Sequence, residues 1–457
     1  MDLSFLDLKD VLGDIKNLGE GEIDSLNFKN ISIDSRTCLK NDLFIAIKGK
    51  NFDGHSFLPE VLNKGVKSVV IKEGMEKLLP DNFSYWVVDD TLEAFQKLTL
   101  LKRKKLSIPV VAITGSVGKT TTKEMIGEVL KKLGKIKLSN ANFNNEIGVG
   151  LTILATDRED KVLVLEMGMR GLGQIENLSK YSKPDIAVIT NIGTAHIGLL
   201  GSKKNITYAK CEISKFLNPK GVVIIPANDL LLEETLRESW KGRIIKVELL
   251  NIENQKESFK KDDNLRGFYN ASNKTILIEE NIFEISFEGF HNASNFLFAY
   301  AVAKELGIDF ESFNKFDFVS LGGRNKILKS IKTTIYDESY NASPESVKAC
   351  IKNLLEKPRN KFFIFGSMQE LGGESEKFHK EIFNLINNSD IEKCLFICDK
   401  KNEKIYTNYL KDKKKFLVLN NIKDVPKEIN KSTKKGDSIL IKGSRYWQLE
   451  KIIELIN

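Results

Sequence analysis

The fold of this chain is decided by residues 108–122, IPVVAITGSVGKTTT. Residues 109–113 form a short apolar, β-branched run, which is typical of a strand buried on both faces. A glycine-containing loop follows directly. Beyond it a helix is predicted that ends near Gly134 and has one apolar face, formed by Met125, Ile126, Val129, Leu130 and Leu133. We therefore expect a strand, a loop and a helix N-terminus in immediate succession.

Such a junction is typical of a phosphate-binding loop, because glycines let backbone N–H groups approach an anion and the helix dipole adds positive charge. Lys119 would supply a full charge near the β/γ phosphates, and the Thr120 hydroxyl is placed to bind Mg²⁺. The residues predicted to bind ATP here are Thr114, Gly115, Ser116, Val117, Gly118, Lys119 and Thr120. Ile113 replaces the first glycine of the pattern G-x-x-x-x-G-K-S/T. The alternative is a tight turn with an incidental Gly-Lys-Thr, but the strand and helix around it favour nucleoside triphosphate binding.

Length and composition indicate an ordinary globular protein. The chain has 457 residues, of which 41% are hydrophobic and 29% charged, so about three domains are expected. No apolar run approaches the roughly 20 residues of a membrane span, and the acidic N-terminus lacks the basic region of a signal peptide. We expect a cytoplasmic protein without membrane insertion.

The cysteines and the charges exclude other classes. Five cysteines without a C-x-x-C pair predict buried reduced thiols rather than disulfides or a zinc site. The net charge of +8 comes from lysines interspersed with acids, whereas nucleic-acid binding would require basic residues clustered with aromatic ones. The basic run at 101–106, LKRKKL, is interpreted as a solvated linker or helix end. No nucleic-acid partner is expected.

Strands alternate with helical patterns along the chain, which predicts an α/β fold with mostly parallel sheets. The expected organisation is a small N-terminal α/β domain over residues 1–105, a central P-loop-type ATP-binding domain over 106–321 and a C-terminal Rossmann-like domain over 322–457. Ligands of parallel sheets gather at the carboxyl ends of the strands, so polar residues at predicted strand ends are candidate site residues.

In the central domain, Glu166 follows the predicted strand 161–165, and His196 lies in the loop after strand 185–189. Both would lie near the triphosphate and could bind a divalent cation. The alternative is that Glu166 is a helix cap and His196 a turn residue, but the placement of both at strand ends beside the glycine loop favours a metal.

Lys210, at the start of a helix predicted over 210–217, is by itself an ordinary solvated lysine or a partner of Glu212. Asn295, before a helix predicted over 296–306, is a helix cap or reads a base edge.

The outer domains carry further polar clusters. Asp34-Ser35-Arg36 could bind an anion, although a local ion pair in a surface turn is the default. In the C-terminal domain, strand 333–336 ends in DESYNASPE, where Ser343 is a predicted N-cap and Pro344 the first helical residue. Strands 361–365 and 438–441 end in GSMQELG and KGSR. Polar loops on a separate domain favour an ATP-driven enzyme with two further substrates over a plain ATPase, and predict that the C-terminal domain closes on the nucleotide.

Taken together, these motifs resemble the Mur ligase family. In chain order they are TGSVGKTTTKE, NFNNEIG, EMGMRGLGQI, TNIGTAHIG, AKCEI, HNASN and GGRNKIL. DSR, DGHSF, DESYNASPES, GSMQELG with His379, and IKGSR are similar to the branch of the family that joins D-alanyl-D-alanine to UDP-N-acetylmuramoyl-tripeptide in peptidoglycan synthesis. The resemblance implies a ligase that uses ATP and Mg²⁺ and proceeds through an acyl phosphate. We expect this ligase to be a monomer.

The resemblance also implies roles for individual residues. The catalytic residues would be Lys119, Glu166, His196 and Lys210, and the Mg²⁺ ligands Thr120, Glu166, His196 and a carbamate on Lys210. ATP would also contact Asn295 on its adenine side and Arg324 and Asp337 on its ribose and phosphates. Substrates would contact Ser35 and Arg36 at the UDP-sugar, and Asn145, Tyr340, Asn341, Ser444 and Arg445 elsewhere. The role of Lys210 follows from the resemblance alone.

Two residues depart from the family pattern, since Ser367 stands where aspartate is usual and Gly150 where proline is usual. Ser367 removes a negative charge, and Gly150 is expected to change only local rigidity. Three other functions stay open. A sister ligase that adds a single amino acid and a folylpolyglutamate synthetase are both disfavoured by DESYNASPES and GSMQELG. A P-loop ATPase acting on nucleic acid or as a switch is disfavoured because no basic-aromatic groove is visible.

Overall fold

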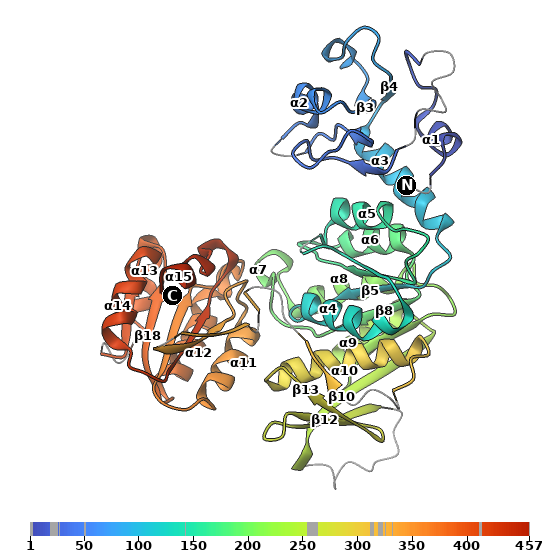
Figure 1. Ribbon diagram of the computed structural model, residues 1–457. Helices are drawn as coiled ribbons and strands as arrows, with labels where there is room; N and C mark the ends of the chain where they lie inside the picture. Colours follow the sequence, from blue (N-terminus) through green and yellow to red (C-terminus); the bar gives the residue numbers. More distant parts are fainter. Residues whose placement is uncertain are drawn as a thin grey trace.

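The computed structural model describes residues 3–18, 26, 28–49, 52–141, 143–253, 264–310, 315–318, 323–324, 326–330, 332–410 and 414–456. Three sheets, each covered by helices, make three α/β domains (Figure 1). This confirms the predicted fold class. The exact boundaries after residues 105 and 321 stay predictions, and residues 321 and 322 lie outside the described residues.

The N-terminal sheet is parallel with the order β1-β2-β3-β4. Its elements are α1 (Phe5–Leu12), β1 (Asn30–Ser32), β2 (Asp42–Ile45), η2 (Gly54–Phe57), α2 (Leu58–Asn63), β3 (Ser68–Lys72), η3 (Glu76–Leu78), β4 (Tyr85–Val88) and α3 (Thr91–Lys105). The basic run at 101–106 is indeed a helix end, but it is not fully solvated, because Lys102 is buried. The helix α3 leads from this domain to the central one (Figure 1).

The central sheet has the order β14-β13-β12-β11-β10-β9-β8-β5-β7-β6, and only its β11–β12–β13 pairs are antiparallel among the described strands. Its strands are β5 (Val110–Thr114), β6 (Ile136–Leu138), β7 (Val162–Glu166), β8 (Ile186–Ile189), β9 (Val222–Pro226), β10 (Arg243–Asn251), β11 (Leu265–Asn270), β12 (Thr275–Ile278), β13 (Asn281–Ile285) and β14 (Lys315–Phe316). Its helical elements are α4 (Lys119–Leu130), η4 (Lys131–Leu133), α5 (Glu146–Leu154), α6 (Gln174–Ser182), α7 (Ile197–Leu200), α8 (Lys203–Cys211), η5 (Glu212–Ser214), α9 (Leu230–Ser239) and α10 (Phe290–Glu305).

Strand β5 is buried on both faces, as its composition predicts. Val111 and Ile113 belong to the core under α4 and α10, while Val110 and Ala112 belong to the core on the opposite face, under α5, α6, α8 and α9. Alternate residues of a strand point to opposite faces. Helices therefore pack on both faces of β5, and this packing fixes the position from which the following loop begins.

The C-terminal sheet has the order β15-β16-β20-β17-β18-β19, with only the β15–β16 pair antiparallel in the described part. Its elements are β15 (Lys326–Lys329), β16 (Thr333–Asp337), α11 (Pro344–Leu355), β17 (Lys361–Gly366), η7 (Gly372–Glu374), α12 (Ser375–Asn387), β18 (Ile391–Ile397), α13 (Lys400–Thr407), β19 (Phe416–Leu419), η8 (Ile422–Asp424), α14 (Val425–Ser432), β20 (Asp437–Lys442), η9 (Arg445–Trp447) and α15 (Glu450–Ile456). Ser343 caps α11 and Pro344 is its first residue, as predicted.

Two predicted helix starts are wrong. Lys210 lies near the end of α8 and does not open a helix, because α8 begins earlier, at the Ser202 cap. Asn295 lies inside α10, which begins after Gly289. All five cysteines are free and buried, as expected. Within the described ranges, no helix is both long and apolar enough to cross a bilayer.

Candidate active site

The loop between β5 and α4 has a backbone that requires glycine at two positions. Gly115 has a φ of 150°, and a Cβ there would lie 1.9 Å from Oγ1 of Thr190. Gly118 is the left-handed N-cap of α4, with a φ of 83°, and a Cβ there would lie 2.7 Å from Oδ1 of Asn295. Any side chain at these positions would change the course of the loop.

The loop after β8 holds this glycine loop in place. Ser116 N–H donates to the backbone oxygen of Asn191 at 3.1 Å, and Val117 N–H donates to its Oδ1 at 3.0 Å. Gly193 N–H in turn donates to Oγ of Ser116 at 2.8 Å. The first N–H groups of α4 have no partner within the helix and are the donors left for an anion. Sequence reasoning missed Asn191, although it lies in the TNIGTAHIG motif.

Lys119 is the first residue of α4, and its Nζ donates to the backbone oxygen of Gly115 at 2.8 Å. Burial lowers the pKa of Lys119, the nearby Glu166 raises it in part, and the positive charge of Arg324 lowers it further. Arg324 from the C-terminal domain therefore acts on the same small region as Lys119 and Glu166. An anion with several charges would neutralise these cations.

Thr120 and Glu166 meet at the end of β7. The Thr120 hydroxyl donates to Oε2 of Glu166 at 2.7 Å, and Asn144 Nδ2 donates to Oε1 at 2.9 Å. The ammonium of Lys123, which is fully buried in α4, lies 4.0 Å from Oε2. Glu166 is thus a buried carboxylate with a hydroxyl, an amide and a cation around it. Lys123 and Asn144 were not predicted as site residues, although both lie within predicted motifs.

His196 and Lys210 both lie close enough to Lys119 for its charge to affect them. Burial lowers the pKa of His196, Glu370 opposes this change, and the charges of Lys119 and Lys210 add to it. Lys210 is 2% exposed, and burial followed by repulsion from Lys119 holds its pKa well below the usual value. The expected partner of Lys210 is bound elsewhere, because Glu212 accepts from the N–H groups of Gly173 and Glu176.

The predicted C-terminal residues form one cluster. The Tyr340 ring is near two guanidinium groups, with Arg324 3.5 Å and Arg445 5.7 Å from its ring centroid. Asn341 ties this cluster to β20, because its backbone oxygen accepts from Lys442 Nζ at 3.1 Å and its Oδ1 from Arg445 N–H at 3.3 Å.

Asp337 and Ser444 form hydrogen bonds within and between the loops of the C-terminal domain. Asp337 is buried and accepts from the backbone N–H of Gly323 at 3.0 Å and from the Ser339 hydroxyl at 2.6 Å. Its contacts therefore fix the segment that carries Arg324. The Ser444 hydroxyl accepts from Gln369 N–H at 2.8 Å, which joins the loops after β20 and β17.

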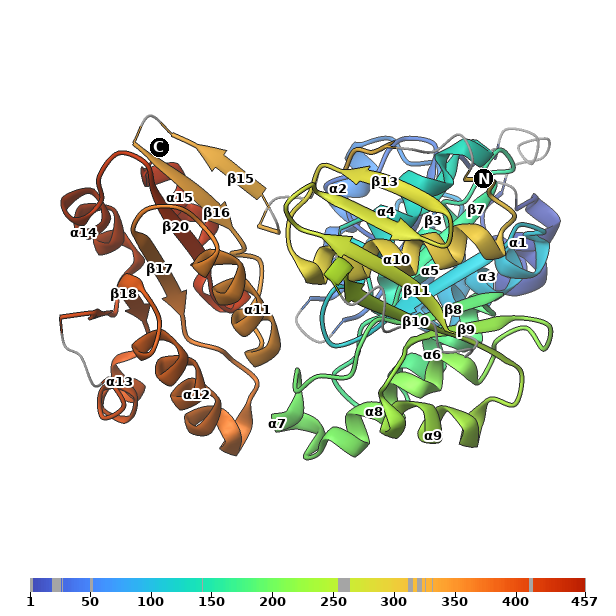
Figure 2. The same cartoon turned by 90° about the horizontal axis from the view of Figure 1, so that it is seen from below.

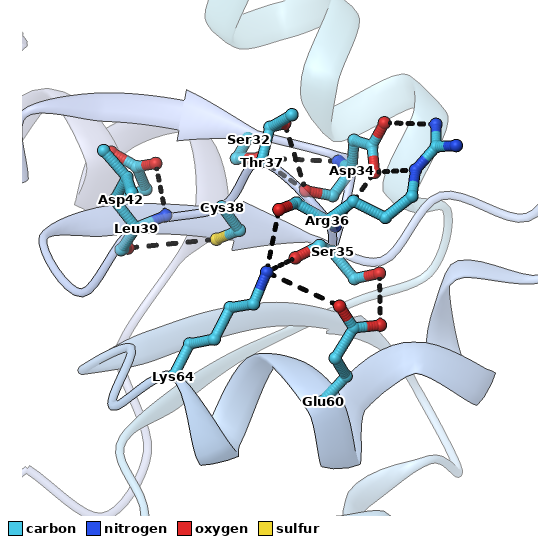
Figure 3. A network of polar contacts seen from close by, with 10 residues as sticks. All are labelled: Ser32, Asp34, Ser35, Arg36, Thr37, Cys38, Leu39, Asp42, Glu60 and Lys64. Atoms are coloured by element: carbon cyan, nitrogen blue, oxygen red, sulfur yellow. Dashed lines mark hydrogen bonds and ion pairs between the residues drawn. The ribbon is translucent and has the colours of Figure 1, made fainter.

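The predicted UDP-sugar residues belong to a separate network in the N-terminal domain (Figure 3). The Ser35 hydroxyl donates to Glu60 Oε2 at 2.8 Å, and Lys64 Nζ donates to the backbone oxygen of Arg36 at 2.9 Å. The Arg36 side chain is 82% exposed and pairs with Asp34 at 2.7 Å, which lowers the pKa of Asp34 through their hydrogen bond. The structure therefore shows the local ion pair that was expected by default for this surface turn, and the Arg36 side chain projects into solvent.

The remaining predicted residues form hydrogen bonds within the protein. Asn295 Oδ1 accepts from the Thr122 hydroxyl at 3.2 Å and lies beside Gly118, so it contacts the glycine loop. Asn145 is the N-cap of α5 and accepts from Gly148 N–H at 2.9 Å. Ser367 is buried, and its Oγ accepts from the Trp447 indole N–H at 3.1 Å. In this chain that hydroxyl therefore packs against η9 in the interior.

The donor set fits a hard cation bound jointly with phosphate. Among the described residues no group of three or more His, Cys, Asp or Glu side chains could hold a metal ion alone. Mg²⁺ is usually held by one or two carboxylates together with substrate phosphates and water. The buried oxygens of Thr120 and Glu166 at the glycine loop match that pattern, so the residues present fit the ion.

This geometry defines a P-loop protein of α/β architecture, with a glycine loop at a helix N-terminus and a carboxylate and lysines at the carboxyl edge of a parallel sheet. Comparisons identify the family. Models described as "Mur ligase family, catalytic domain", "Mur ligase middle domain" and "Mur ligase, glutamate ligase domain" match residues 27–110, 113–303 and 323–445. The chain belongs to the Mur ligase family.

Individual relatives extend over nearly the whole chain. A UDP-N-acetylmuramoyl-tripeptide–D-alanyl-D-alanine ligase from Synechocystis sp. is 36% identical over 82% of this chain and 79% of its own length. The crystal structure of MurF from Acinetobacter baumannii has a TM-score of 0.85 at 25% identity, covering 99% of this chain and 98% of that one. MurF ligase from Thermotoga maritima in complex with ADP has a TM-score of 0.78 at 26% identity, covering 95% and 98%.

Proposed function

We propose that this chain is an ATP-dependent ligase that joins D-alanyl-D-alanine to UDP-N-acetylmuramoyl-tripeptide in peptidoglycan precursor synthesis. The observation that carries the proposal is the similarity to ligases of this specificity across all three domains. A P-loop alone would support any nucleotide-dependent activity, whereas the outer domains supply the contacts that select the two other substrates.

The reaction must turn a carboxylate, which is a poor electrophile, into a reactive acyl group. A carboxylate oxygen of the tripeptide attacks the γ-phosphorus of ATP, ADP leaves, and an acyl phosphate forms. The dipeptide amine then attacks the acyl carbon, loses a proton, and expels inorganic phosphate from a tetrahedral intermediate. Both steps bring negative groups together, so cations must offset the repulsion.

The chain's own residues provide that positive charge. The N-terminus of α4 and Lys119 would hold the β/γ phosphates, and Arg324 would approach them from the C-terminal domain. Asn295 lies against the glycine loop, where it would contact the nucleotide, and Asp337 would orient Arg324 and reach the ribose. Thr120, Glu166 and His196 would hold Mg²⁺, which neutralises phosphate oxygens when bound. The relative from Thermotoga maritima was crystallised with ADP, in line with a nucleotide at this loop.

Lys210 is proposed to act as a carbamate. An amine must be neutral to attack CO₂, and the burial that lowers the pKa of Lys210 favours the neutral amine. Addition of CO₂ releases a proton and converts a buried neutral amine into an anion. That anion would lie close to the Lys119 ammonium and could share a second Mg²⁺ with the substrates.

The outer domains would hold the other substrates. Ser35 and Arg36 would bind the UDP-sugar, and the Tyr340, Asn341, Ser444 and Arg445 cluster would bind the dipeptide, with Asn145 near the tripeptide. Arg445 carries a charge suited to the dipeptide carboxylate. We further propose that the enzyme is a cytoplasmic monomer that has no nucleic-acid partner.

Phosphate release from ATP tests this function when each substrate is left out in turn. Release should require Mg²⁺, UDP-N-acetylmuramoyl-tripeptide and D-alanyl-D-alanine together, and should yield a UDP-linked pentapeptide by mass. Release with a single amino acid on a shorter acceptor would instead identify a sister ligase. Turnover that ignores both substrates would contradict the proposal.

A further inference from the structure

A carboxylate from the C-terminal domain contacts the predicted cation ligand His196. Nδ1 of His196 lies 2.7 Å from Oε2 of Glu370, a short polar contact whose angles are not those of a regular hydrogen bond. The other oxygen of Glu370 lies 3.6 Å from Nη2 of Arg170. Arg170 lies in the loop after β7, and His196 in the loop after β8. One carboxylate thus bridges the loops that follow β7 and β8, the two neighbours of β5 in the sheet.

The backbone holds both partners of this contact in place. His196 and Glu370 have φ values of 68° and 62°, in the left-handed region that non-glycine residues rarely adopt unless their surroundings impose it. Gly198 N–H donates to the backbone oxygen of Glu370 at 3.3 Å. A Cβ on Gly198 would lie 2.5 Å from the backbone nitrogen of Gly372, so the two loops meet backbone to backbone.

A second contact secures the same loop. Glu345, in the first turn of α11, accepts from both the N–H and the hydroxyl of Thr194 at 2.8 Å. The helix α7 lies at the border of the central and C-terminal domains in both ribbon views (Figures 1 and 2). The C-terminal domain therefore contacts residues 194–198 at several points, and these contacts place Glu370 against His196.

We propose that Glu370 is a positioning residue for His196, supplied by one domain to a cation ligand on another. With the carboxylate on Nδ1, the imidazole keeps its proton on Nδ1 and its lone pair on Nε2, the atom that would face the cation. The ligand is then correctly oriented only while the C-terminal domain is docked. This inference rests on the proposed function, because the cation is that of the ATP site.

Binding of Mn²⁺ in the presence of ADP, followed by electron paramagnetic resonance, tests the proposal on the full chain. Glu370→Ala should weaken Mn²⁺ binding by about tenfold, whereas Glu370→Gln should retain most of the affinity, because the glutamine side chain still offers an oxygen to Nδ1. The matched control is Glu374→Ala, which removes a carboxylate of the neighbouring turn that pairs with Lys377 at 2.7 Å. This variant should bind Mn²⁺ like the wild type. In a His196→Ala background, Glu370→Ala should cause no further loss.

Wild-type affinity in Glu370→Ala, or a full additional loss in the His196→Ala background, would overturn the proposal.

A second readout needs neither metal nor nucleotide. The chain contains four histidines, so the ¹⁵N signal of His196 can be assigned by its loss in His196→Gln. It should show the Nδ1–H tautomer in the wild type and a mixture in Glu370→Ala. An Nε2–H tautomer in the wild type would refute the positioning role. If the wild type instead shows the Nδ1–H tautomer but does not bind Mn²⁺ with ADP, the proposed function and the cation role built on it would be refuted.

Discussion

At the scale of single residues, Lys210 has the least ordinary environment. Its side chain is 2% exposed, and burial and the charge of Lys119 both lower its pKa. A solvated lysine would have neither property. The sequence around it, AKCEI, contains no chemical reason for the burial, which arises because α8 packs its last turn into the core beneath β8 and β9. Only the family resemblance directed attention to this lysine.

Replacing Lys210 by arginine tests the carbamate. Arginine has a side chain of similar length but cannot form a carbamate with CO₂, so the rate of phosphate release should fall by on the order of 100-fold. A ¹³C resonance from labelled bicarbonate should also disappear. The control is Lys203→Arg at the exposed start of the same helix, which should keep both. A fully active Lys210→Arg enzyme would contradict the carbamate role.

His379 makes stability depend on pH. Burial lowers its pKa to about 4, its Nε2 accepts from Met368 N–H at 2.9 Å and its Nδ1 lies 2.7 Å from the backbone oxygen of Ser375. Because the folded pKa lies below the unfolded value, the unfolded chain binds more protons. The contribution of His379 is therefore complete above the unfolded pKa of about 6.5 and is lost as the pH falls toward 4, by up to about 3 kcal/mol.

Urea unfolding at about pH 7.5 and about pH 5 measures this dependence. The wild type should lose more stability on acidification than His379→Gln, which has no titrating group at this position. His291 also has a pKa lowered by burial, to about 4, so some acid destabilisation should remain in the variant. An identical pH dependence in both proteins would exclude His379 as a cause.

At the scale of elements, packing requires a glycine at position 150, where the sequence predicted only a change in local rigidity. A Cβ on Gly150 would lie 2.6 Å from the Phe95 ring, so α5 packs directly on α3 and leaves no room for a side chain. Gly150→Ala should gain up to about 1 kcal/mol of helix propensity but lose about 1–3 kcal/mol through overpacking.

Thermal unfolding of Gly150→Ala should therefore show a lower midpoint than the wild type. A smaller side chain at the contact, in Phe95→Leu/Gly150→Ala, should recover part of the loss. The control is Gly171→Ala, where the nearest atom to a new Cβ is 3.7 Å away, and it should leave the midpoint nearly unchanged. A stabilised Gly150→Ala would mean that the packing of α3 on α5 adjusts freely.

The elements themselves were largely predictable, because β-branched runs and a capped helix such as α11 carry local signals. The starts of α8 and α10 were not. Helix α10 begins after Gly289, at Phe290, within a stretch whose polar residues suggested a cap, and tertiary burial of Asn292 and Asn295 overrides their preference for helix ends. Glu166 and Lys119 could be found from strand ends and a glycine motif. The contacts of Asn191 and Glu370 could not, because they depend on loops brought together by the complete fold.

At the scale of the whole molecule, the candidate residues are divided among three domains. Ser35 and Arg36 belong to the N-terminal domain, Lys119 and Glu166 to the central domain, and the Tyr340 cluster to the C-terminal domain. Figure 1 shows the three domains. A single reaction needs the substrates that these three sets would hold to meet at one acyl group. Relative movement of the domains is therefore expected when the substrates bind.

Small-angle X-ray scattering should show this movement. An ATP analogue with UDP-N-acetylmuramoyl-tripeptide should reduce the radius of gyration of the wild type, because the outer domains close on the nucleotide. Lys119→Ala, which removes the charge of the glycine loop, should show little change at the same concentrations. A wild-type profile that both ligands leave unaltered would contradict domain closure.

The central claim is that ATP activates a carboxylate as an acyl phosphate, and the fate of one oxygen atom tests it most directly. UDP-N-acetylmuramoyl-tripeptide labelled with ¹⁸O in its terminal carboxylate should transfer one ¹⁸O atom to inorganic phosphate for each amide bond formed with D-alanyl-D-alanine, as measured by mass spectrometry. Amide formation that releases only unlabelled phosphate would contradict the mechanism.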